Sequence, residues 1–187
     1  IPMPQIDAFH ETAVAGMFLV GQASGTPQVK NATNLGRAAV QRMLQQGYKP
    51  GSASAVRAQV DVIIVGSGPA GLSAAVTCVE FGLSYVVLEK EREFSWTIRN
   101  YYHKGKEVMA EPHDIALTAS LPHWDTSREE LLGAWAKMIQ EANMQIRYQS
   151  NVTDIKKDGE CFNVTLTDSA KQTTVLTAAR VVLAIGT

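Results

Sequence analysis

The hydrophobic pattern of the chain is clearest between residues 60 and 91. The β-branched run from Val62 to Val65 is short and is followed by glycine, which is typical of a parallel strand buried on both faces. A helix from about Ala70 to Phe81 and a second apolar strand from about Tyr85 to Leu88 come next. A strand, a turn, a helix and a strand in this order predict an α/β fold.

Upstream of this unit, the pattern predicts another strand and another helix. Met17 to Val20 is a short apolar strand, and it is followed by a glycine-containing turn and a helix that stops at Gly47. Residues 48–59 are rich in Pro, Gly, Ser and Ala and have no periodicity, so we expect a linker over residues 51–59. One face of the predicted helix is apolar and should face the core: Leu35, Ala39, Met43 and Leu44.

Downstream of the unit, the pattern predicts a loop, a helix and then only strands. Residues 92–125 are irregular and rich in aromatic and basic residues, and we expect a solvated loop that covers part of a ligand. The spacings of Thr126 with Glu129 and of Ser127 with Glu130 predict the start of an amphipathic helix that ends near Met144. The segments after it predict a β-meander: Gln145–Tyr148, Val152–Lys156, Cys161–Thr167, Thr173–Thr177 and Val181–Ile185.

Composition narrows the class of protein. The 187 residues suffice for one domain with a real core, and 45% hydrophobic and 19% charged residues are ordinary for a globular protein. A net charge of -1 without a basic stripe argues against nucleic acid as a partner. No apolar run is long enough to span a bilayer and nothing resembles a signal peptide, so we expect a cytoplasmic protein without a membrane partner.

The cysteines and histidines predict neither a metal site nor a redox disulfide. Cys78 and Cys161 are far apart and form no CxxC motif. The spacing of His103, His113 and His123 fits no metal template. We therefore expect no bound metal, and we name no catalytic acid, base or nucleophile.

The glycine turn after the first strand of the unit carries the clearest chemical signal. Gly66 begins a tight turn, Gly68 lets a phosphate approach the backbone, and Gly71 lets the next helix pack closely on its strand. The helix N-terminus at this turn suits a pyrophosphate. Glu89 ends the second strand, where its carboxylate can accept both hydroxyls of a ribose. The assembled unit predicts a dinucleotide ligand, against the simpler alternatives of a glycine-rich turn and a surface acid.

Three motifs together resemble the FAD-dependent pyridine nucleotide-disulfide oxidoreductases, most closely the thioredoxin reductase-like flavoproteins. VIIVGSGPAGLSAA with Glu89 is similar to the first FAD motif, VVLAIGT to the second, and ETAVAGMFLVGQ to the third. The resemblance implies a three-layer FAD/NAD(P)-binding (Rossmann-like) α/β domain with a parallel sheet, helices and a β-meander. It also implies FAD as the cofactor and NAD(P)H as the electron donor of the full-length parent, with an electron acceptor that the sequence does not identify.

The resemblance also implies the residues that contact FAD. The glycine turn would hold the pyrophosphate, the acid and its neighbour the adenosine ribose, and the meander the adenine. The third motif and the helix after it would face the ribityl chain and the flavin ring. The implied cofactor-binding residues are Gly66, Gly68, Pro69, Ala70, Gly71, Glu89, Lys90, Val152, Ala184, Gly186, Gly21, Gln22, Asn31 and Ala32.

The chain departs from the family pattern in two ways. Gln22 stands where the third motif has Asp, and the third motif comes first, without the second glycine fingerprint of an NAD(P)-binding domain. We hypothesise a circularly permuted FAD domain, in which residues 1–50 supply the part that usually comes last and residues 60–187 the rest. Ile1 and Thr187 would then lie where the NAD(P)-binding domain is usually inserted, and the chain would be a piece of a longer protein. In the alternative, residues 1–50 belong to a preceding flavoprotein module.

Three functions compete at this point. The first is the FAD-binding domain of a flavin-dependent oxidoreductase, and a homodimer stays open for it. The second is a non-catalytic dinucleotide-binding or regulatory module, in which Gln22 indicates relaxed contact with flavin. The third is an NAD(P)-dependent Rossmann dehydrogenase, which the β-meander and the Pro69-Ala70 pair both disfavour.

Overall fold

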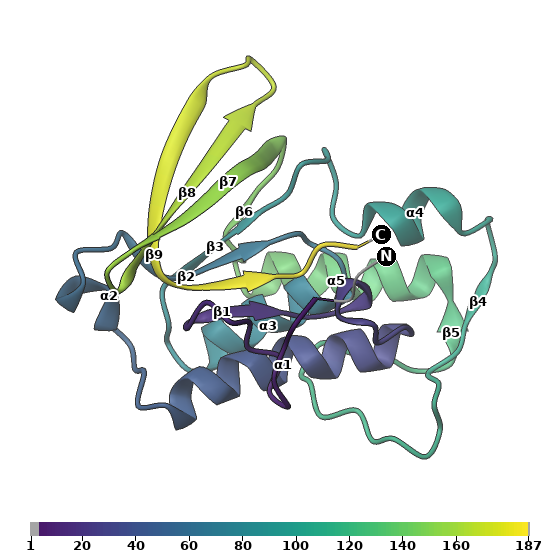
Figure 1. The fold of residues 1–187 in the computed structure, drawn as a ribbon. Coiled ribbons are helices and arrows are strands. Elements are labelled where there is room, and N and C mark those ends of the chain that lie inside the picture. Colours follow the sequence, from purple (N-terminus) through teal and green to yellow (C-terminus); the bar gives the residue numbers. More distant parts are fainter. Residues whose placement is uncertain (1–3, 187) are drawn as a thin grey trace.

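The structure, a computed structural model, describes residues 4–186, which form a large mixed sheet with helices on one face and a separate two-stranded ribbon (Figure 1). A 3-10 turn, η1, spans Gln22–Ser24. The helices are α1 (Val29–Gln45), α2 (Ser52–Ala55), α3 (Pro69–Glu80), α4 (Trp96–Tyr101) and α5 (Arg128–Glu141). The strands are β1 (Met17–Leu19), β2 (Val60–Val65), β3 (Tyr85–Leu88), β4 (Glu107–Val108), β5 (Thr126–Ser127), β6 (Ile146–Arg147), β7 (Ser150–Asp158), β8 (Cys161–Asp168) and β9 (Thr173–Leu183).

The seven-stranded sheet has a parallel and an antiparallel part. Its order is β6-β3-β2-β9-β8-β7, and β1 pairs with the end of β9. The pairs β6·β3, β3·β2, β2·β9 and β9·β1 are parallel, whereas β9·β8 and β8·β7 are antiparallel. The parallel part is the Rossmann-like sheet, and β7, β8 and the first half of β9 form the meander. The predicted fold class, with its parallel sheet, helices and meander, is confirmed.

Apolar side chains of the parallel strands alternate between two cores. Val62 and Ile64 of β2 face the core that α1, α3 and α5 cover, while Ile63 and Val65 face a second core under the meander. Phe162 of β8 is fully buried in this second core. The molecule therefore has three layers, with the parallel strands in the middle, as Figure 1 shows.

Two predicted strands are one in the structure. Thr173–Thr177 and Val181–Ile185 were expected to be separate, but β9 runs without a break through Ala178–Arg180. Ala178 pairs with Phe162 of β8 on one side and with Val60 of β2 on the other, so the backbone stays hydrogen-bonded where the sequence is least apolar. β9 therefore joins the meander to the parallel strands.

The segment 92–125 is more ordered than the expected loop. It contains α4, and β4 pairs with β5 to form a two-stranded ribbon. The Arg128 guanidinium donates to the carbonyl oxygens of Arg99 (2.9 Å) and Tyr102 (2.7 Å), which ties the end of α4 to the start of α5. The order of this segment therefore depends on contacts with residues outside it.

The expected linker also has structure, because a buried acid binds it. The Asp61 carboxylate, 1% exposed, accepts hydrogen bonds from the backbone N–H groups of Ala53 (2.9 Å) and Gly51 (3.3 Å). It also accepts one from Ser84 N–H (2.9 Å) at the start of β3. Residues 51–59 therefore contain the helical turn α2, fixed beside the starts of β2 and β3.

Residues 17–45 lie in the same sheet and the same helical layer as residues 60–186. Met17, Phe18 and Leu19 pair with residues 181–183 of β9, and α1 packs along α3. A Cβ at Gly36 of α1 would overlap the carbonyl oxygen of Ala70, so the two helices touch at their backbones. The permuted hypothesis requires these neighbours, and the permutation itself stays a prediction. The expected surroundings of Ile1 and Thr187 lie outside the described residues.

Across residues 4–186, no helix combines the length and apolar character needed to cross a membrane.

Candidate dinucleotide-binding cleft

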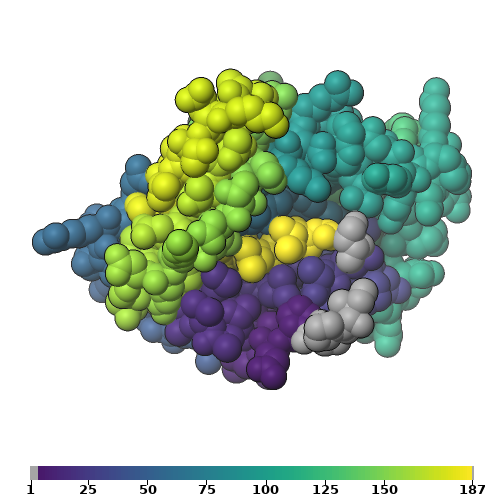
Figure 2. Space-filling view, turned by 45° about the horizontal axis from the view of Figure 1, so that its top comes forward, coloured from purple at the N-terminus to yellow at the C-terminus, as the bar shows by residue number. Residues whose placement is uncertain are grey.

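A cleft of about 590 Å³ lies at the carboxyl ends of the parallel strands. Its floor contains Val65 of β2, Leu88 of β3 and Ala184 after β9, and its rim contains the N-termini of α1, α3 and α4. Figure 2 shows this hollow, with the end of β9 in yellow between the teal segment that contains α4 and the purple N-terminal segment. Ligands of open α/β sheets bind at this edge of the strands.

The three glycines of the turn have different surroundings. Gly66 has a φ of 101°, and a Cβ there would lie 2.6 Å from the carbonyl oxygen of Ala184. A Cβ at Gly71 would overlap the carbonyl oxygen of Gly66, so α3 packs directly on the turn. A Cβ at Gly68 would meet no protein atom within 4 Å, although this residue lines the cleft. Gly66 and Gly71 are therefore needed by the fold, whereas Gly68 leaves space for a ligand.

Two long helices begin at the cleft with free backbone N–H groups. The N-cap residues are Gly68 for α3 and Gln28 for α1, and neither helix has a side-chain cap or an acidic residue in its first turn. Pro69 occupies the first turn of α3. Uncapped helix N-termini present N–H donors and a positive dipole end. The cleft therefore suits a ligand with negative charge along its middle and at its α1 end.

Glu89 is fixed in one orientation inside the cleft. Its side chain is 7% exposed, and its Oε2 accepts hydrogen bonds from the Ser67 N–H (2.8 Å) and the Ser67 hydroxyl (2.6 Å). Its Oε1 accepts one from the Glu91 N–H (2.8 Å). Because each carboxylate oxygen has two lone pairs, Oε1 keeps one acceptor site for a ligand hydroxyl.

The negative charge of Glu89 also acts on Tyr148, which follows β6. Burial raises the pKa of Tyr148, and the Glu89 carboxylate raises it further. Glu89 is joined to β7 through its backbone, since its carbonyl oxygen accepts from Ser150 N–H (2.8 Å). This hydrogen bond brings Ser150, Asn151 and Val152 to the same end of the cleft.

α4 forms one wall of the cleft, in a segment where the sequence predicted a loop that covers part of a ligand. The Ser95 N–H and hydroxyl donate to the Ser67 carbonyl oxygen at 3.0 and 3.3 Å, which ties the start of α4 to the glycine turn. Trp96, Tyr101 and Tyr102 then line the cleft, and Tyr101 is 78% exposed. The only sequence signal was the aromatic content of residues 92–125, which did not indicate a helix.

All but two of the predicted cofactor-binding residues line the cleft. Gly71 is covered by the turn itself. Asn31 lies on α1 but directs its amide to the Pro27 carbonyl oxygen (3.2 Å) and to Gln28 Oε1 (3.0 Å). Asn31 is therefore placed to order the turn before α1. The lining residues that sequence reasoning missed include Ser67, Ser95, Trp96, Tyr101, Tyr102, Thr26, Gln28 and Val29.

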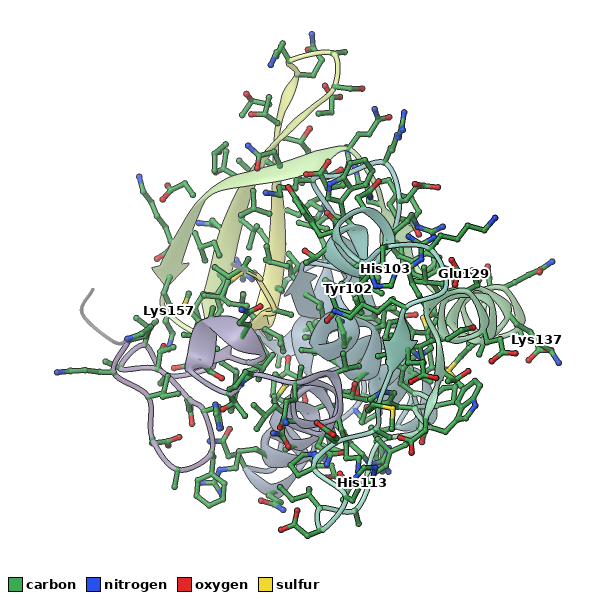
Figure 3. The ribbon with its side chains drawn as sticks, turned by 90° about the vertical axis from the view of Figure 1, so that its right-hand side faces the viewer. Tyr102, His103, His113, Glu129, Lys137 and Lys157 are labelled. Carbon is green, nitrogen blue, oxygen red and sulfur yellow. The ribbon has the colours of Figure 1, made fainter. Side chains whose placement is uncertain are left out.

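The histidines of residues 92–125 do not gather at the cleft. His103 follows α4 and lies close to Tyr102, whereas His113 lies well apart from them at the bottom of the same view (Figure 3). His113 is 3.5 Å from the Asp125 carboxylate, and His123 is buried with both ring nitrogens unpartnered. Within the described part of the chain, no cluster of His, Cys, Asp and Glu could hold a metal ion.

Solved structures and one curated protein are similar to parts of the chain. Bacillithiol disulfide reductase Bdr from Bacillus cereus superimposes with a TM-score of 0.55 at 25% identity, over 66% of this chain and 39% of its own. OTEMO, in an FAD-bound form, superimposes with a TM-score of 0.55 at 19% identity, over 69% and 26%. Digeranylgeranylglycerophospholipid reductase 1 from Methanococcoides burtonii is 41% identical over 51 residues, which are 27% of this chain and 12% of that protein.

The chain spans well under half of the length of these proteins. The family model described as pyridine nucleotide-disulphide oxidoreductase matches residues 63–187, from the first strand of the glycine-turn unit to the end of the chain. This match covers most of the sequence and includes the glycine turn, Glu89 and the meander. The chain belongs to the pyridine nucleotide-disulphide oxidoreductase family.

Proposed function

We propose that this chain is the FAD-binding domain of a flavin-dependent oxidoreductase of thioredoxin reductase-like type, which passes electrons from NAD(P)H through FAD to an acceptor. The observation that carries the proposal is the course of the cleft. It runs from Glu89, past the free space at Gly68, to the N-terminus of α1. A dinucleotide fits this order of groups. Its ribose lies at the acid, its pyrophosphate at the N-terminus of α3 and its second ring system at the N-terminus of α1.

Each part of the cleft has a role in this proposal. Oε1 of Glu89 accepts one hydrogen bond from a hydroxyl group of the adenosine ribose, and the meander residues Asn151 and Val152 lie against the adenine. The pyrophosphate lies over Gly68 and accepts hydrogen bonds from backbone N–H groups in the first turn of α3. The remaining half of FAD extends to Gln22 and the start of α1. The family membership and the FAD-bound neighbour support this assignment of the ligand.

FAD supplies the redox chemistry when it is bound, and the residues of the chain bind and orient it. The first turn of α1 directs N–H groups and a positive dipole end toward the flavin half. Gln22, where the motif has Asp, lines this end and brings a neutral amide that donates or accepts a hydrogen bond. The site therefore favours negative charge on the ligand at this end.

We also propose that residues 1–50 complete the domain in a permuted order. The support is the pairing of β1 with the last strand of the sheet and the backbone contact between α1 and α3. The connection between the two parts, residues 46–59, is held by Asp61 beside the starts of β2 and β3. A chain in which residues 4–47 are moved behind residue 186 through a flexible linker should keep its fold and FAD affinity. A rearranged chain that folds but loses FAD would contradict the permutation.

A visible absorption spectrum tests the main proposal. The purified protein, with FAD added if necessary, should show flavin bands that bleach with dithionite and return in air. The midpoint temperature of thermal unfolding should rise with FAD concentration, because a ligand that binds only the folded state stabilises it. A protein that takes up no FAD would overturn the proposal.

The departure at Gln22 favours the second candidate, a dinucleotide-binding module without redox work. The two are separated by comparing FAD with NAD⁺ in the same thermal assay. Stabilisation by FAD alone supports the flavin-dependent function. Equal stabilisation by NAD⁺, with no flavin spectrum, supports the binding module.

A further inference from the structure

Lys30, in the first turn of α1, carries a buried positive charge. Its residue is 6% exposed, and its Nζ donates to the carbonyl oxygens of Pro112 (2.6 Å) and Ile115 (2.9 Å). Both acceptors belong to residues 112–118, a segment that we call the strap. These carbonyl groups accept from two of the three donors of the ammonium and carry no net charge.

The charge of Lys30 has no carboxylate beside it in the described part of the chain. None of the ion pairs within residues 4–186 includes Lys30. The Asp125 carboxylate interacts only weakly with Lys30, because it is half exposed. It accepts a hydrogen bond from the Ala110 N–H (2.7 Å) and lies beside His113 instead. A buried cation without a counter-charge creates a strong positive potential around it.

The positive charge of Lys30 acts on the buried side chain of His123. The residue is 6% exposed, and neither of its ring nitrogens has a partner. Burial lowers the pKa of His123, and the positive charge of Lys30 lowers it further, against a smaller opposite effect of the Asp125 carboxylate. Burial and the charge of Lys30 therefore both disfavour protonation of His123, which would add a second positive charge.

A cation at this position opposes the helix dipole. The positive end of α1 is its N-terminus, where a Lys side chain is unfavourable and an acid would be stabilising, yet the first turn contains no acid. Val29 and Ala32 of the same turn line the cleft. The helix end, its free N–H groups and the charge of Lys30 are therefore all on the one turn of α1 that borders the cleft, and together they favour negative charge on a ligand there.

We propose that Lys30 raises the reduction potential of the flavin by stabilising the negative charge of its reduced ring. The inference rests on the proposed function, which places the flavin half of FAD at the start of α1. Two electrons and one proton from a donor convert the neutral oxidised ring to an anionic reduced ring, and the field of Lys30 favours this product. Lys30 does not touch the ring and acts only through its charge.

The test uses the full chain loaded with FAD and three variants. Lys30→Gln keeps an N–H donor for the strap and removes the charge, and Lys30→Arg keeps both. Asn34→Ala is the structural control, because Asn34 ties the same strap to α1 through Ala116 O and Thr118 N–H, both at 2.8 Å, without any charge. The readout is the midpoint potential, measured by slow reduction with xanthine and xanthine oxidase against a reference dye.

Lys30→Gln should shift the midpoint potential in the negative direction. At a fixed dye potential, the ratio of oxidised to reduced flavin should rise about tenfold. Lys30→Arg and Asn34→Ala should stay within about twofold of the wild type, as expected for variants that keep the charge. An unchanged potential in Lys30→Gln overturns the inference, and so does an equal shift in Asn34→Ala, which would assign the effect to the strap.

A measurement on the wild type keeps the inference testable if Lys30→Gln does not fold. The N1–H group of the reduced flavin should lose its proton at a lower pH in the protein than in free FAD, followed by absorbance under anaerobic conditions. Ionisation at the same or a higher pH overturns the inference. A wild type that binds no FAD overturns the proposed function and this inference together, whereas bound FAD with an unshifted Lys30→Gln overturns this inference alone.

Discussion

The N-termini of α3 and α1 meet at one cleft, but they are built in different ways. The start of α3 follows a buried strand and a glycine turn, and Gly71 allows the helix to pack on that turn. The start of α1 follows Gln28, which has a positive φ of 81°, and Gly36 allows the helix to pack on Ala70 of α3. Both helices need a glycine at a backbone contact. For α3 the partner is five residues away, whereas for α1 it is more than thirty residues away, so only the first contact forms a local motif.

The largest expected effect comes from filling these two backbone contacts. Gly71→Ala and Gly36→Ala should each lower the free energy of unfolding by about 2 to 3 kcal/mol, because each Cβ would overlap a carbonyl oxygen in a close-packed contact. Urea unfolding followed by circular dichroism measures both values. The comparison predicts losses of similar size in the two variants.

Gly133 of α5 provides the matched control. A Cβ at Gly133 would meet no atom within 4 Å, so Gly133→Ala should be neutral or stabilising by up to about 1 kcal/mol. If Gly36→Ala behaved like Gly133→Ala, α1 could move off α3 without cost. The two helix N-termini would then not be fixed relative to each other.

The next effect separates binding from folding at Glu89. Glu89→Ala should weaken FAD binding by about 1 to 3 kcal/mol through lost charge-assisted hydrogen bonds. Glu141→Ala is the control, since Glu141 ends α5 and is not among the residues that line the cleft. Titration with FAD, followed by quenching of flavin fluorescence, gives both affinities. Equal affinity in Glu89→Ala and the wild type would refute the assignment of the ribose to Glu89.

Gly68→Ala tests whether the free space at the N-terminus of α3 belongs to the ligand. Gly68 has an ordinary φ of -73° and nothing within 4 Å of a Cβ, so the fold should be unchanged. FAD affinity should fall about tenfold, because the methyl group occupies space where the phosphate approaches the backbone. Isothermal titration with FAD and urea unfolding are measured on the same sample. Loss of stability without loss of affinity would contradict the assignment of this space to the ligand.

The smallest effect concerns the ion pair that joins the two helices. Arg37 of α1 lies 2.6 Å from Glu80 of α3. Burial acts to raise the pKa of Glu80, but the Ser120 hydroxyl and Arg37 outweigh it and hold this pKa below its ordinary value of 4.5. A carboxylate with a lowered folded-state pKa stabilises the fold above its unfolded-state pKa, and the stabilisation is lost as the pH falls through the folded-state value.

Arg37→Ala should therefore cost about 0.5 to 1 kcal/mol of unfolding free energy near pH 7, a modest value because the pair is partly exposed. Near pH 3 the cost should shrink toward zero. Urea unfolding of Arg37→Ala and Glu80→Gln at both pH values tests this, and the two variants should agree. A cost that grows on acidification would contradict the sign of the Glu80 shift.

The glycine-turn unit was predicted in the most detail because its contacts are local. The unit from β2 to Glu89 has its strand, turn and helix adjacent in sequence, and its glycines meet atoms of the same turn. α2 was missed because its stabilising group, Asp61, lies outside it. α4 was missed because its start is held by Ser67, on the glycine turn.

The same reason explains the gaps in the predicted site. Trp96 and Tyr101 reach the cleft only because α4 is tied across it. Asn31 was assigned to the ligand from its position in a helix, whereas its side chain binds the turn before that helix. The charge of Lys30 could not be weighed without its burial, which the strap produces from more than eighty residues away.

The continuity of β9 has a consequence for the order in which the chain folds during synthesis. β1 pairs with β9 alone among the described strands, and more than 150 residues separate the two. Because β2 and β8 also use β9 as their partner, no sheet that contains β1 can close before residues 173–183 leave the ribosome. Until then, the apolar segment Met17–Leu19 has no strand partner and can associate with other nascent chains.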